Sequence, residues 1–392
     1  MVLPYGYKLL VVGSGFFGAT IAYNVATELG LPVLVLERRS HLGGNSYSEV
    51  DSATGIEYHR YGSHLFHTSS SKVWDFINRF SAFTNYRHRV FTRHNERTYT
   101  MPINLMTINN FFGTNLTPTQ ARTFVAQQVT ESGIGQPSNL EEKAISLIGR
   151  PLYEAFVRGY TAKQWETDPS ALPPEIITRL PVRFNFNDFY FSDTYEGVPA
   201  DGYEAIFKRM LTHPNIHVTT ECDFFEVRGL IDAAIPVVYT GPVDRFYDYQ
   251  FGELGWRTLD FEVERLQVDD FQGAAVVNYP DPDVAFTRIH EFKHLHPERR
   301  HSNGTLIMKE YSRFAARTDE PFYPIGRSVD KQIYEQYRTR SASEDRIVFG
   351  GRLGTYRYLD MHQAIGAALQ AYEFTVAPML TGRPSDRQAW ET

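Results

Sequence analysis

The chain has 392 residues and a formal net charge of −7 at pH 7, with 39 Lys and Arg against 46 Asp and Glu. This length predicts two or three structural units, and the acidic balance argues against nucleic acid or an anionic membrane as a partner. Cys222 is the single cysteine, which excludes an intrachain disulfide, and aromatic residues make up 14% of the chain.

The N-terminal sequence, MVLPYGYKLLVVG, lacks the basic start and small-residue cleavage site of a signal peptide. No apolar run approaches the ~18 residues that a membrane-spanning helix needs. We therefore expect a cytoplasmic protein without membrane insertion.

The first predicted elements form a βαβ unit. Lys8–Val12 is a short apolar strand, Ala19–Leu29 has apolar residues at helical spacing, and Pro32–Leu36 is a second buried strand. The turn between the first strand and the helix reads GSGFFG over residues 13–18. A GxGxxG motif in this context lets backbone N–H groups and the helix dipole hold a pyrophosphate.

Glu37 ends the second strand, about 20 residues after the glycine motif, where a carboxylate accepts hydrogen bonds from an adenosine ribose. The alternative is a tight turn followed by an ordinary surface glutamate. Arg38 and Arg39 would suit the 2′-phosphate of NADP, but Glu37 would repel it. The glycine pair at residues 43–44 is instead similar to the flavoproteins whose backbone passes close to FAD, which favours FAD.

The middle of the chain changes character twice. Residues 104–164 have helical periodicity, with Thr117 and Asn139 as N-caps, and predict an all-helical insertion. A proline-rich loop that carries Trp165 follows. Residues 181–195 and 256–330 alternate apolar with polar and predict antiparallel strands.

The last elements return to the dinucleotide-binding unit. Residues 236–241, PVVYTG, form a predicted strand that ends in Thr-Gly, and Ile347–Gly350 forms another. The final helix, about Met361–Tyr372, would point its positive N-terminus at a reduced flavin, although a plain packing helix is the alternative.

Four histidines lie close together in the sequence, beside two glutamates. Their spacing fits no metal motif, and neighbouring Lys293, Arg299 and Arg300 would repel a cation. We therefore predict a solvated basic turn and no metal site. The histidines are His290, His294, His296 and His301.

Several longer strings together identify a resemblance. They are GSGFFG, ERRSHLGGNSY, YGSHLFHT, NRFSAFTNYRHRV, FVRGYTAKQW, RFNFNDFYF, VVYTGPVD, TRIHEFKH, PFYPI and GRLGTYRYLDM. In this order they resemble the bacterial type of UDP-galactopyranose mutase over nearly the whole chain.

The resemblance implies an α/β fold with a Rossmann-like FAD-binding domain, a helical insertion and an antiparallel sheet domain. We expect the FAD-binding domain at residues 1–62, 198–246 and 330–392. The helical domain with a mobile lid loop is expected at 104–172, and the substrate-binding sheet domain at 63–103, 173–197 and 247–329.

The resemblance also implies an isomerase that interconverts UDP-galactopyranose and UDP-galactofuranose through a covalent galactose adduct at flavin N5, with no net redox change. FAD is the expected cofactor, active when reduced, and a homodimer is the expected assembly. Two rival classes remain: an FAD oxidoreductase of the amine-oxidase type, and a nucleotide-sugar binding module with structural FAD.

Family positions assign the site residues. Arg179 and Arg288 occupy the two diphosphate-binding positions and are the expected catalytic residues. The expected substrate-binding residues are Phe156, Tyr160, Thr161, Trp165, Tyr190, Asn278, Tyr323, Tyr358 and His88. The expected cofactor-binding residues are Gly13, Ser14, Gly15, Phe17, Gly18, Glu37, Arg38, Gly44, Asn45, His64, Leu65, Phe224, Gly241, Arg352, Asp360 and Met361.

The chain departs from the family pattern at a few positions. Ser63 and Leu65 stand where many bacterial members read GPHIFHT, which removes a proline from a loop beside the flavin. His88 stands where several relatives have Asn, and Gly354 replaces a usual Ala.

Overall fold

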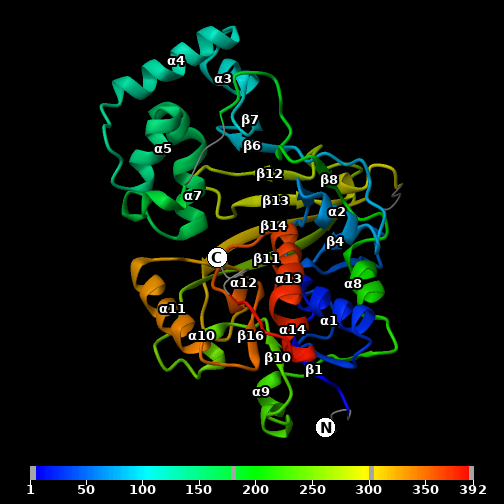
Figure 1. Cartoon of the computed structure of the whole chain (residues 1–392). Helices are drawn as coiled ribbons and strands as arrows, with labels where there is room; N and C mark the ends of the chain where they lie inside the picture. The colour runs from blue at the N-terminus through cyan, green and yellow to red at the C-terminus, as the bar shows by residue number, and fades with distance from the viewer. Residues whose placement is uncertain (1–5, 178–181, 300–303, 388–392) are drawn as a thin grey trace.

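The computed structural model describes residues 6–177, 182–299 and 304–387. In Figure 1 the helical lobe lies at the top, one sheet crosses the middle, and a second sheet with its covering helices forms the lower part. Arg179 and His301, both singled out by the sequence, lie outside the described residues.

A parallel sheet forms the lower part, in the order β16-β10-β1-β2-β9. Leu9 and Val11 pack on one side of this sheet, and Leu10 packs on the other. This alternation follows from the two-residue period of a strand, and burial on both faces explains the continuous apolar runs. The strands are β1 (Leu9–Val12), β2 (Val33–Leu36), β9 (Ile216–Thr219), β10 (Val237–Tyr239) and β16 (Ile347–Phe349).

Helices cover both faces of the parallel sheet. One face packs against α1, α8 and α13, and the other packs against α9, α10 and Tyr337 of α11. The helices of this part are α1 (Phe16–Glu28), α8 (Tyr203–Leu211), α9 (Phe224–Val227), α10 (Val243–Phe246), α11 (Ser328–Ser341), α12 (Gly351–Gly354), α13 (Met361–Ala371) and α14 (Ala377–Thr381).

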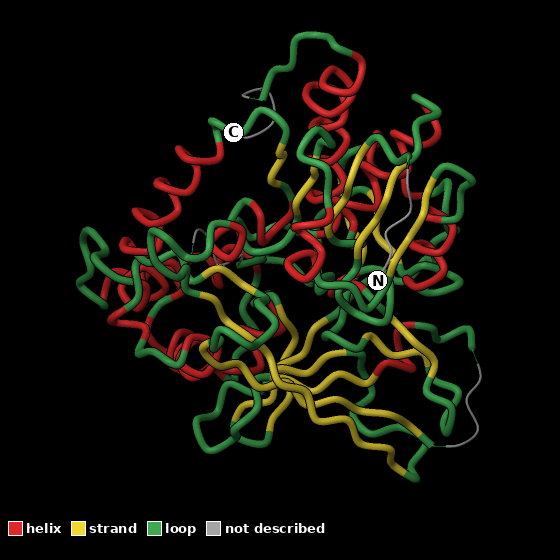
Figure 2. Tube along the Cα trace, turned by 90° about the horizontal axis from the view of Figure 1, so that it is seen from below, coloured by secondary structure: helices red, strands yellow, loops and turns green. Residues whose placement is uncertain are grey.

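The central sheet has the order β15-β11-β14-β13-β12-β6-β7 and fans out across the lower half of Figure 2. It is antiparallel, as predicted, except where β12 runs parallel to β6. Its strands are β6 (Val90–His94), β7 (Arg97–Met101), β11 (Trp256–Leu266), β12 (Val276–Asn278), β13 (Arg288–Glu291), β14 (Thr305–Phe314) and β15 (Tyr323–Pro324).

The helical lobe has its own core, built around Ile108, Ile145 and Tyr153. Thr117 and Asn139 accept backbone hydrogen bonds as N-caps, as the sequence predicted. A π-helical turn, Glu154–Arg158, separates the last two helices. The helices are α3 (Leu105–Phe112), α4 (Pro118–Glu131), α5 (Leu140–Ile148), α6 (Arg150–Tyr153) and α7 (Gly159–Trp165).

Two segments differ from the sequence prediction. The part of 181–195 that is described is mostly loop, because Asn185 and Asn187 accept backbone hydrogen bonds that make turns. The strand β8 (Tyr195–Gly197) begins only at the end of this segment and pairs with β5 (Phe66–Thr68).

The second difference concerns α2 (Ser71–Ile77), which lies in a range expected to belong to the sheet domain. The α2 residues Val73, Phe76 and Ile77 instead pack into the hydrophobic core on one face of the parallel sheet. The helix therefore packs with the Rossmann-like domain. The remaining small sheet pairs β3 (Ser48–Val50) with β4 (Glu57–His59).

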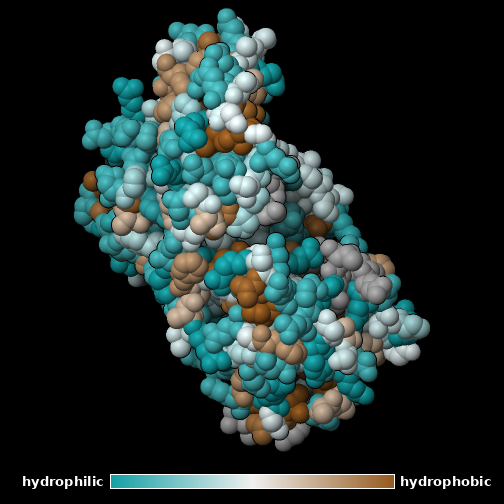
Figure 3. Space-filling model, turned by 90° about the vertical axis from the view of Figure 1, so that its left-hand side faces the viewer, coloured by the Kyte–Doolittle hydropathy of each residue, from teal (hydrophilic) through white to brown (hydrophobic). Residues whose placement is uncertain are grey.

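Hydrophobic atoms on the face drawn in Figure 3 form small patches among hydrophilic ones. Among the described residues, no helix combines the length and the apolar composition that crossing a bilayer requires.

Candidate functional site

A cavity of about 240 Å³ lies where the first strand meets the first helix. The N-terminus of α1 faces it, with Gly15 as N-cap and no acidic residue in the first turn. The helix therefore presents the positive end of its dipole to this cavity. Such a helix end suits a pyrophosphate.

The three motif glycines have different roles. Gly13 has a φ of +100°, and a Cβ there would lie 2.1 Å from Thr240 Oγ1. A Cβ on Gly18 would lie 2.1 Å from the Gly13 carbonyl oxygen. A Cβ on Gly15, in contrast, would meet no atom of the described chain within 4 Å and would enter the cavity. Gly13 and Gly18 thus permit the turn, and Gly15 leaves room for a ligand.

Glu37 is held firmly at the end of β2. Its carboxylate accepts hydrogen bonds from Ser14 N at 3.0 Å, Ser14 Oγ at 2.6 Å and Arg39 N at 2.9 Å. Arg38 and Arg39 both pair with Glu320, at 2.7 and 2.8 Å. Glu320 therefore offsets one of the two positive charges that would attract a 2′-phosphate, and the Glu37 carboxylate would repel such a phosphate.

Most of the expected cofactor-binding residues line this smaller cavity. They are Gly13, Ser14, Gly15, Phe17, Gly18, Glu37, Arg38, Gly44, Asn45, His64, Phe224, Gly241, Arg352 and Met361. Leu65 and Asp360 line a second, larger cleft of about 740 Å³ instead. His64, Arg352 and Met361 line both, so the two cavities meet at these three side chains.

His64 at this junction is an uncharged donor. Burial lowers its pKa to about 4, and its Nδ1 lies 2.7 Å from the Gly62 carbonyl oxygen. A carbonyl only accepts, so Nδ1 carries the proton and Nε2 is unprotonated at neutral pH.

Arg288 on β13 places a positive charge on the wall of the larger cleft. Its Nε lies 3.1 Å from Glu310 Oε1, and Nη2 donates to the Tyr160 hydroxyl at 2.5 Å. Burial alone would lower the pKa of Arg288, but the Glu310 carboxylate raises it above its ordinary value, so the guanidinium stays charged. Burial raises the pKa of Tyr160, which remains a neutral phenol.

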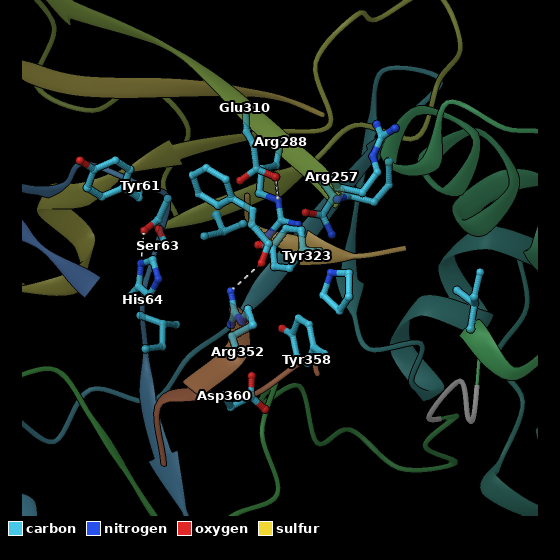
Figure 4. Close-up of a pocket in the computed structure, with 18 of the residues that line it drawn as sticks. Tyr61, Ser63, His64, Arg257, Arg288, Glu310, Tyr323, Arg352, Tyr358 and Asp360 are labelled. Carbon is cyan, nitrogen blue, oxygen red and sulfur yellow. Dashed lines mark hydrogen bonds and ion pairs between the residues drawn. The ribbon is translucent and has the colours of Figure 1, made fainter. Parts of the chain in front are cut away.

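Arg352 provides a second cation beside the two stacked tyrosines Tyr323 and Tyr358. Its guanidinium carbon lies 5.4 Å from the Tyr323 ring centre and 5.0 Å from that of Tyr358. Figure 4 shows Arg288, Tyr323 and Arg352 one below another in the middle of the view, with Tyr358 close by. Two guanidinium groups and several phenolic hydroxyls suit a diphosphate.

The cleft brings together the expected catalytic residue Arg288 and most of the expected substrate-binding residues. The substrate-binding residues on its wall are His88, Tyr160, Trp165, Tyr190, Asn278, Tyr323 and Tyr358. Asn278 Oδ1 is buried and has no hydrogen-bond partner among the described residues, so it is available to a ligand. Burial lowers the pKa of His88 to about 3, which keeps this wall histidine uncharged.

Phe156 and Thr161 are absent from the cleft wall as far as the chain is described. The π-helical turn directs Phe156 into the helical core, where its ring centre lies 5.1 Å from Tyr99 and 5.2 Å from Phe111. Thr161 is only 7% exposed, on α7. Neither residue lines the cleft in this arrangement, and their roles in substrate binding stay predictions.

The start of the lid loop is anchored on the cleft wall. The buried Arg257 donates to the Trp165 carbonyl at 3.4 Å and pairs with Glu166 at 3.0 Å. The Lys163 ammonium, which has three N–H donors, lies within hydrogen-bond distance of four backbone carbonyls from Tyr279 to Phe286. The sequence analysis missed Arg257, although a basic residue at the apolar start of a predicted strand was a signal for it.

The histidine cluster is not the solvated turn that the sequence suggested. His290 and His296 are only 1% and 3% exposed. His290 contacts Glu310, His296 contacts Glu57 and Glu298, and the less buried His294 contacts Asp270 and Glu291. Carboxylate partners that lie far away in the sequence explain why these polar groups are buried.

Within the described part of the chain, two groups of side chains each bring three potential ligand atoms within 4.8 Å of one another. One is Asp270, Glu291 and His294, where Glu291 already accepts hydrogen bonds from two backbone N–H groups and from Thr305. The other is His67, Asp360 and His362, where His67 pairs with Asp193 at 2.7 Å. The absence of a metal stays a prediction.

Known proteins resemble this chain in sequence and in fold. A family model described as UDP-galactopyranose mutase matches residues 155–358, and one described as an NAD(P)-binding Rossmann-like domain matches 11–80. A probable UDP-galactopyranose mutase from Klebsiella pneumoniae is 43% identical over 363 residues, which cover 93% of each chain. A dTDP-fucopyranose mutase from Escherichia coli is 40% identical over 380 residues, 94% of this chain and 98% of that one.

Among solved structures, a crystal structure of reduced UDP-galactopyranose mutase superposes with a TM-score of 0.73 at 16% identity. The match covers 95% of this chain and 97% of that one. At this identity the likeness concerns the fold alone, and it confirms the predicted α/β class with a Rossmann-like domain.

Proposed function

The chain belongs to the UDP-galactopyranose mutase family of isomerases, and we propose that it interconverts UDP-galactopyranose and UDP-galactofuranose with FAD as its cofactor. The observation that carries this proposal is the junction at His64, Arg352 and Met361. There, one end of a dinucleotide in the smaller cavity would meet the sugar of a nucleotide-sugar in the larger cleft.

The residues of the smaller cavity fit FAD. Gly15 leaves space for the pyrophosphate at the α1 N-terminus, and Glu37 lies at the position for the adenosine ribose. His64 and Arg352 would lie beside the isoalloxazine. Reduced flavin, when bound, would supply N5 as a nucleophile toward the anomeric carbon, so that UDP leaves without net redox change.

The protein's own groups would bind and orient the substrate. Arg288 and Arg352 would hold the diphosphate, which must be stabilised as it leaves the sugar, and the hydroxyls of Tyr160, Tyr323 and Tyr358 would donate to its oxygens. Arg179 would add a third cation, as the family resemblance implies. Trp165 would cover the sugar and exclude water.

A second candidate substrate is dTDP-fucopyranose, because the E. coli relative at 40% identity is a dTDP-fucopyranose mutase. That nucleotide-sugar carries a 5-methyl base and lacks hydroxyls on the ribose and on the sugar. A site built to bind a hydroxyl discriminates strongly against the analogue that lacks it. A comparison of the two substrates therefore separates the two activities.

We further propose a cytoplasmic homodimer whose partners are nucleotide-sugars rather than nucleic acid. The acidic net charge of −7 supports the exclusion of polyanions, and the paired arginines of one cleft are consistent with a single diphosphate.

The test measures interconversion of UDP-galactopyranose and UDP-galactofuranose by the purified holoenzyme, in the oxidised state and after dithionite reduction. We expect turnover only in the reduced state. Equal rates in both states would overturn the proposed role of reduced flavin. A kcat/KM for dTDP-fucopyranose at least tenfold above that for UDP-galactopyranose would reassign the substrate. Consumption of oxygen with net sugar oxidation would indicate the amine-oxidase class.

A further inference from the structure

A chain of buried polar contacts joins the cofactor-side loop to Arg288. Ser63 Oγ lies 2.7 Å from His290 Nδ1, His290 Nε2 lies 3.1 Å from Glu310 Oε2, and Glu310 Oε1 lies 3.1 Å from Arg288 Nε. His290 and Glu310 are only 1% and 3% exposed. In Figure 4, Glu310 lies next to Arg288, and Ser63 lies next to His64.

The sheet register places these groups together. Arg288 on β13 pairs directly with Glu310 on β14. His290 follows two residues later on β13, so it lies on the same face of the sheet as Arg288. Both side chains of β13 therefore reach the one carboxylate that projects from β14.

The chemistry of the partners assigns each proton. Burial would raise the pKa of Glu310, but Arg288 and His290 hold it below its usual value, so the carboxylate only accepts. Burial lowers the pKa of His290, which is therefore neutral. Its Nε2 must then carry the proton and donate to Glu310, while Nδ1 accepts from the Ser63 hydroxyl.

Glu310 is the counter-ion of the Arg288 guanidinium on its β-sheet side, an ion pair in which Arg288 Nε makes no hydrogen bond among the described residues. Its Oε1 contacts Arg288 and also accepts from Thr287 Oγ1 at 3.3 Å, whereas Oε2 has His290 as its donor. Without His290, Oε2 would be buried without this hydrogen bond. The carboxylate would then turn to find another donor, and the guanidinium would move with it.

We propose that His290 is a positioning residue that acts through Glu310 to hold Arg288 in place for the diphosphate, with Ser63 fixing the imidazole tautomer. This inference rests on the proposed function, because Arg288 is its point of action. Ser63 precedes His64 at the junction of the two cavities. The network therefore links the loop beside the cofactor to the arginine that would bind the diphosphate.

The test compares His290→Gln and His290→Leu in the FAD-loaded enzyme. The glutamine amide can donate to Glu310 as the imidazole does, and leucine cannot. We expect His290→Leu to weaken UDP binding by calorimetry and to raise KM, each about tenfold, while His290→Gln stays within threefold of the wild type. His290→Asn, whose amide is too short to reach Glu310, should resemble leucine and serves if the leucine variant does not fold.

His294→Leu is the matched control, because His294 also contacts carboxylates but lines neither cavity as described. It should leave UDP binding unchanged. Flavin content and thermal unfolding are measured on every variant. A variant that keeps normal values of both but binds UDP weakly has a displaced Arg288 and an intact fold. Equal UDP affinity in wild type and His290→Leu would overturn the inference.

A double-mutant cycle tests the role of Ser63. Ser63→Ala should weaken UDP binding in the wild-type background and should cause no further loss in His290→Leu, where the hydroxyl has lost its partner. Additive effects would overturn the tautomer assignment. If the wild type itself neither bound UDP nor turned over UDP-galactopyranose, the proposed function would fail. If the wild type bound UDP and His290→Leu bound it equally well, only the positioning role of His290 would fail.

Discussion

The two cavities are built in different ways. The smaller one is made largely of backbone: the glycine turn, the N-terminus of α1 and the ends of neighbouring parallel strands. The larger one is made of side chains from β13, β14, β15, α7 and the segment after α12, which lie far apart in the sequence. A backbone-built site is encoded locally, whereas a side-chain-built site depends on how separate elements pack.

The two cavities also differ in how they would stabilise a charged ligand. In the smaller cavity the ligand would meet fixed N–H dipoles, which need no counter-charge. In the larger cleft Arg288 is held near a buried carboxylate, so removing one member of the pair leaves the other unpaired. The two regions should therefore respond differently to mutation.

Gly15→Val should have the largest effect. The added side chain would fill the space left for the pyrophosphate, while its Cβ would meet no atom of the described chain. We expect a folded protein that purifies without flavin and turns over substrate at least about 100-fold more slowly, a loss of roughly 3 kcal/mol in transition-state stabilisation. Flavin absorbance and circular dichroism check this.

Gly135→Val is the control, because a Cβ at Gly135 also meets no described atom within 4 Å and this glycine lines neither cavity as described. It should keep its flavin. A Gly15→Val protein that still bound FAD with normal affinity would contradict the idea of a backbone-built cavity.

Arg288→Ala should have the next largest effect. We expect kcat/KM to fall at least about 50-fold with flavin still bound, and the unfolding temperature to fall because Glu310 remains buried without its counter-ion. The control Arg313→Ala removes another strand arginine that pairs with carboxylates but lines neither cavity as described. Near-normal turnover in Arg288→Ala would show that the cleft does not bind the diphosphate there.

His88→Asn should change the pH dependence of stability. Burial lowers the pKa of His88 to about 3, whereas the unfolded chain has an ordinary histidine pKa near 6.5. Between these values the unfolded state binds a proton that the folded state does not, so stability is lost as pH falls from 6.5. Asn cannot titrate at this position. As the pH falls below 6.5, the free energy of unfolding of the variant should therefore decrease by up to about 1.4 kcal/mol less per pH unit than that of the wild type.

Denaturant unfolding at pH 7 and pH 5 measures this slope. The other buried histidines, including His59 and His64, keep their own contributions in both proteins because burial lowers their pKa as well. An unchanged slope in His88→Asn would mean that His88 is solvated and is not a buried part of the cleft wall.

Glu320→Gln should have the smallest effect. It removes the partner of Arg38 and Arg39, whose contacts are partly solvent-exposed and therefore weak. We expect FAD affinity to change less than about threefold, with a gain in binding of 2′-phosphorylated dinucleotides to the flavin-free protein. A large loss of FAD would show that this ion pair, and not the backbone, determines cofactor binding.

The same contrast explains what the sequence could predict. The strand, glycine turn, helix and Glu37 follow one another within a short stretch, so their geometry is set locally. Local rules also placed the caps Thr117 and Asn139. By contrast, nothing near Arg288 in the sequence indicates that Glu310 would lie opposite it, because strand register brings them together.

The errors have the same origin. His290 was expected in a solvated basic turn because the histidine spacing fits no metal motif and basic residues follow it, but Glu310 and Ser63 are supplied by distant segments. Family position gives Phe156 a role in substrate binding that stays a prediction, because the π-helical turn and the aromatic neighbours direct its ring into the core in this arrangement. Residues 182–194 alternate like a strand, but asparagine side chains form turns there.

The central claim is that the flavin in one cavity meets the sugar in the other at His64, Arg352 and Met361. A crystal structure of the reduced enzyme soaked with UDP-galactopyranose tests it most directly. The account predicts the diphosphate on Arg288 and Arg352, and the anomeric carbon in van der Waals contact with the flavin ring at this junction. A sugar bound away from the flavin, or a diphosphate that does not contact Arg288, would contradict it.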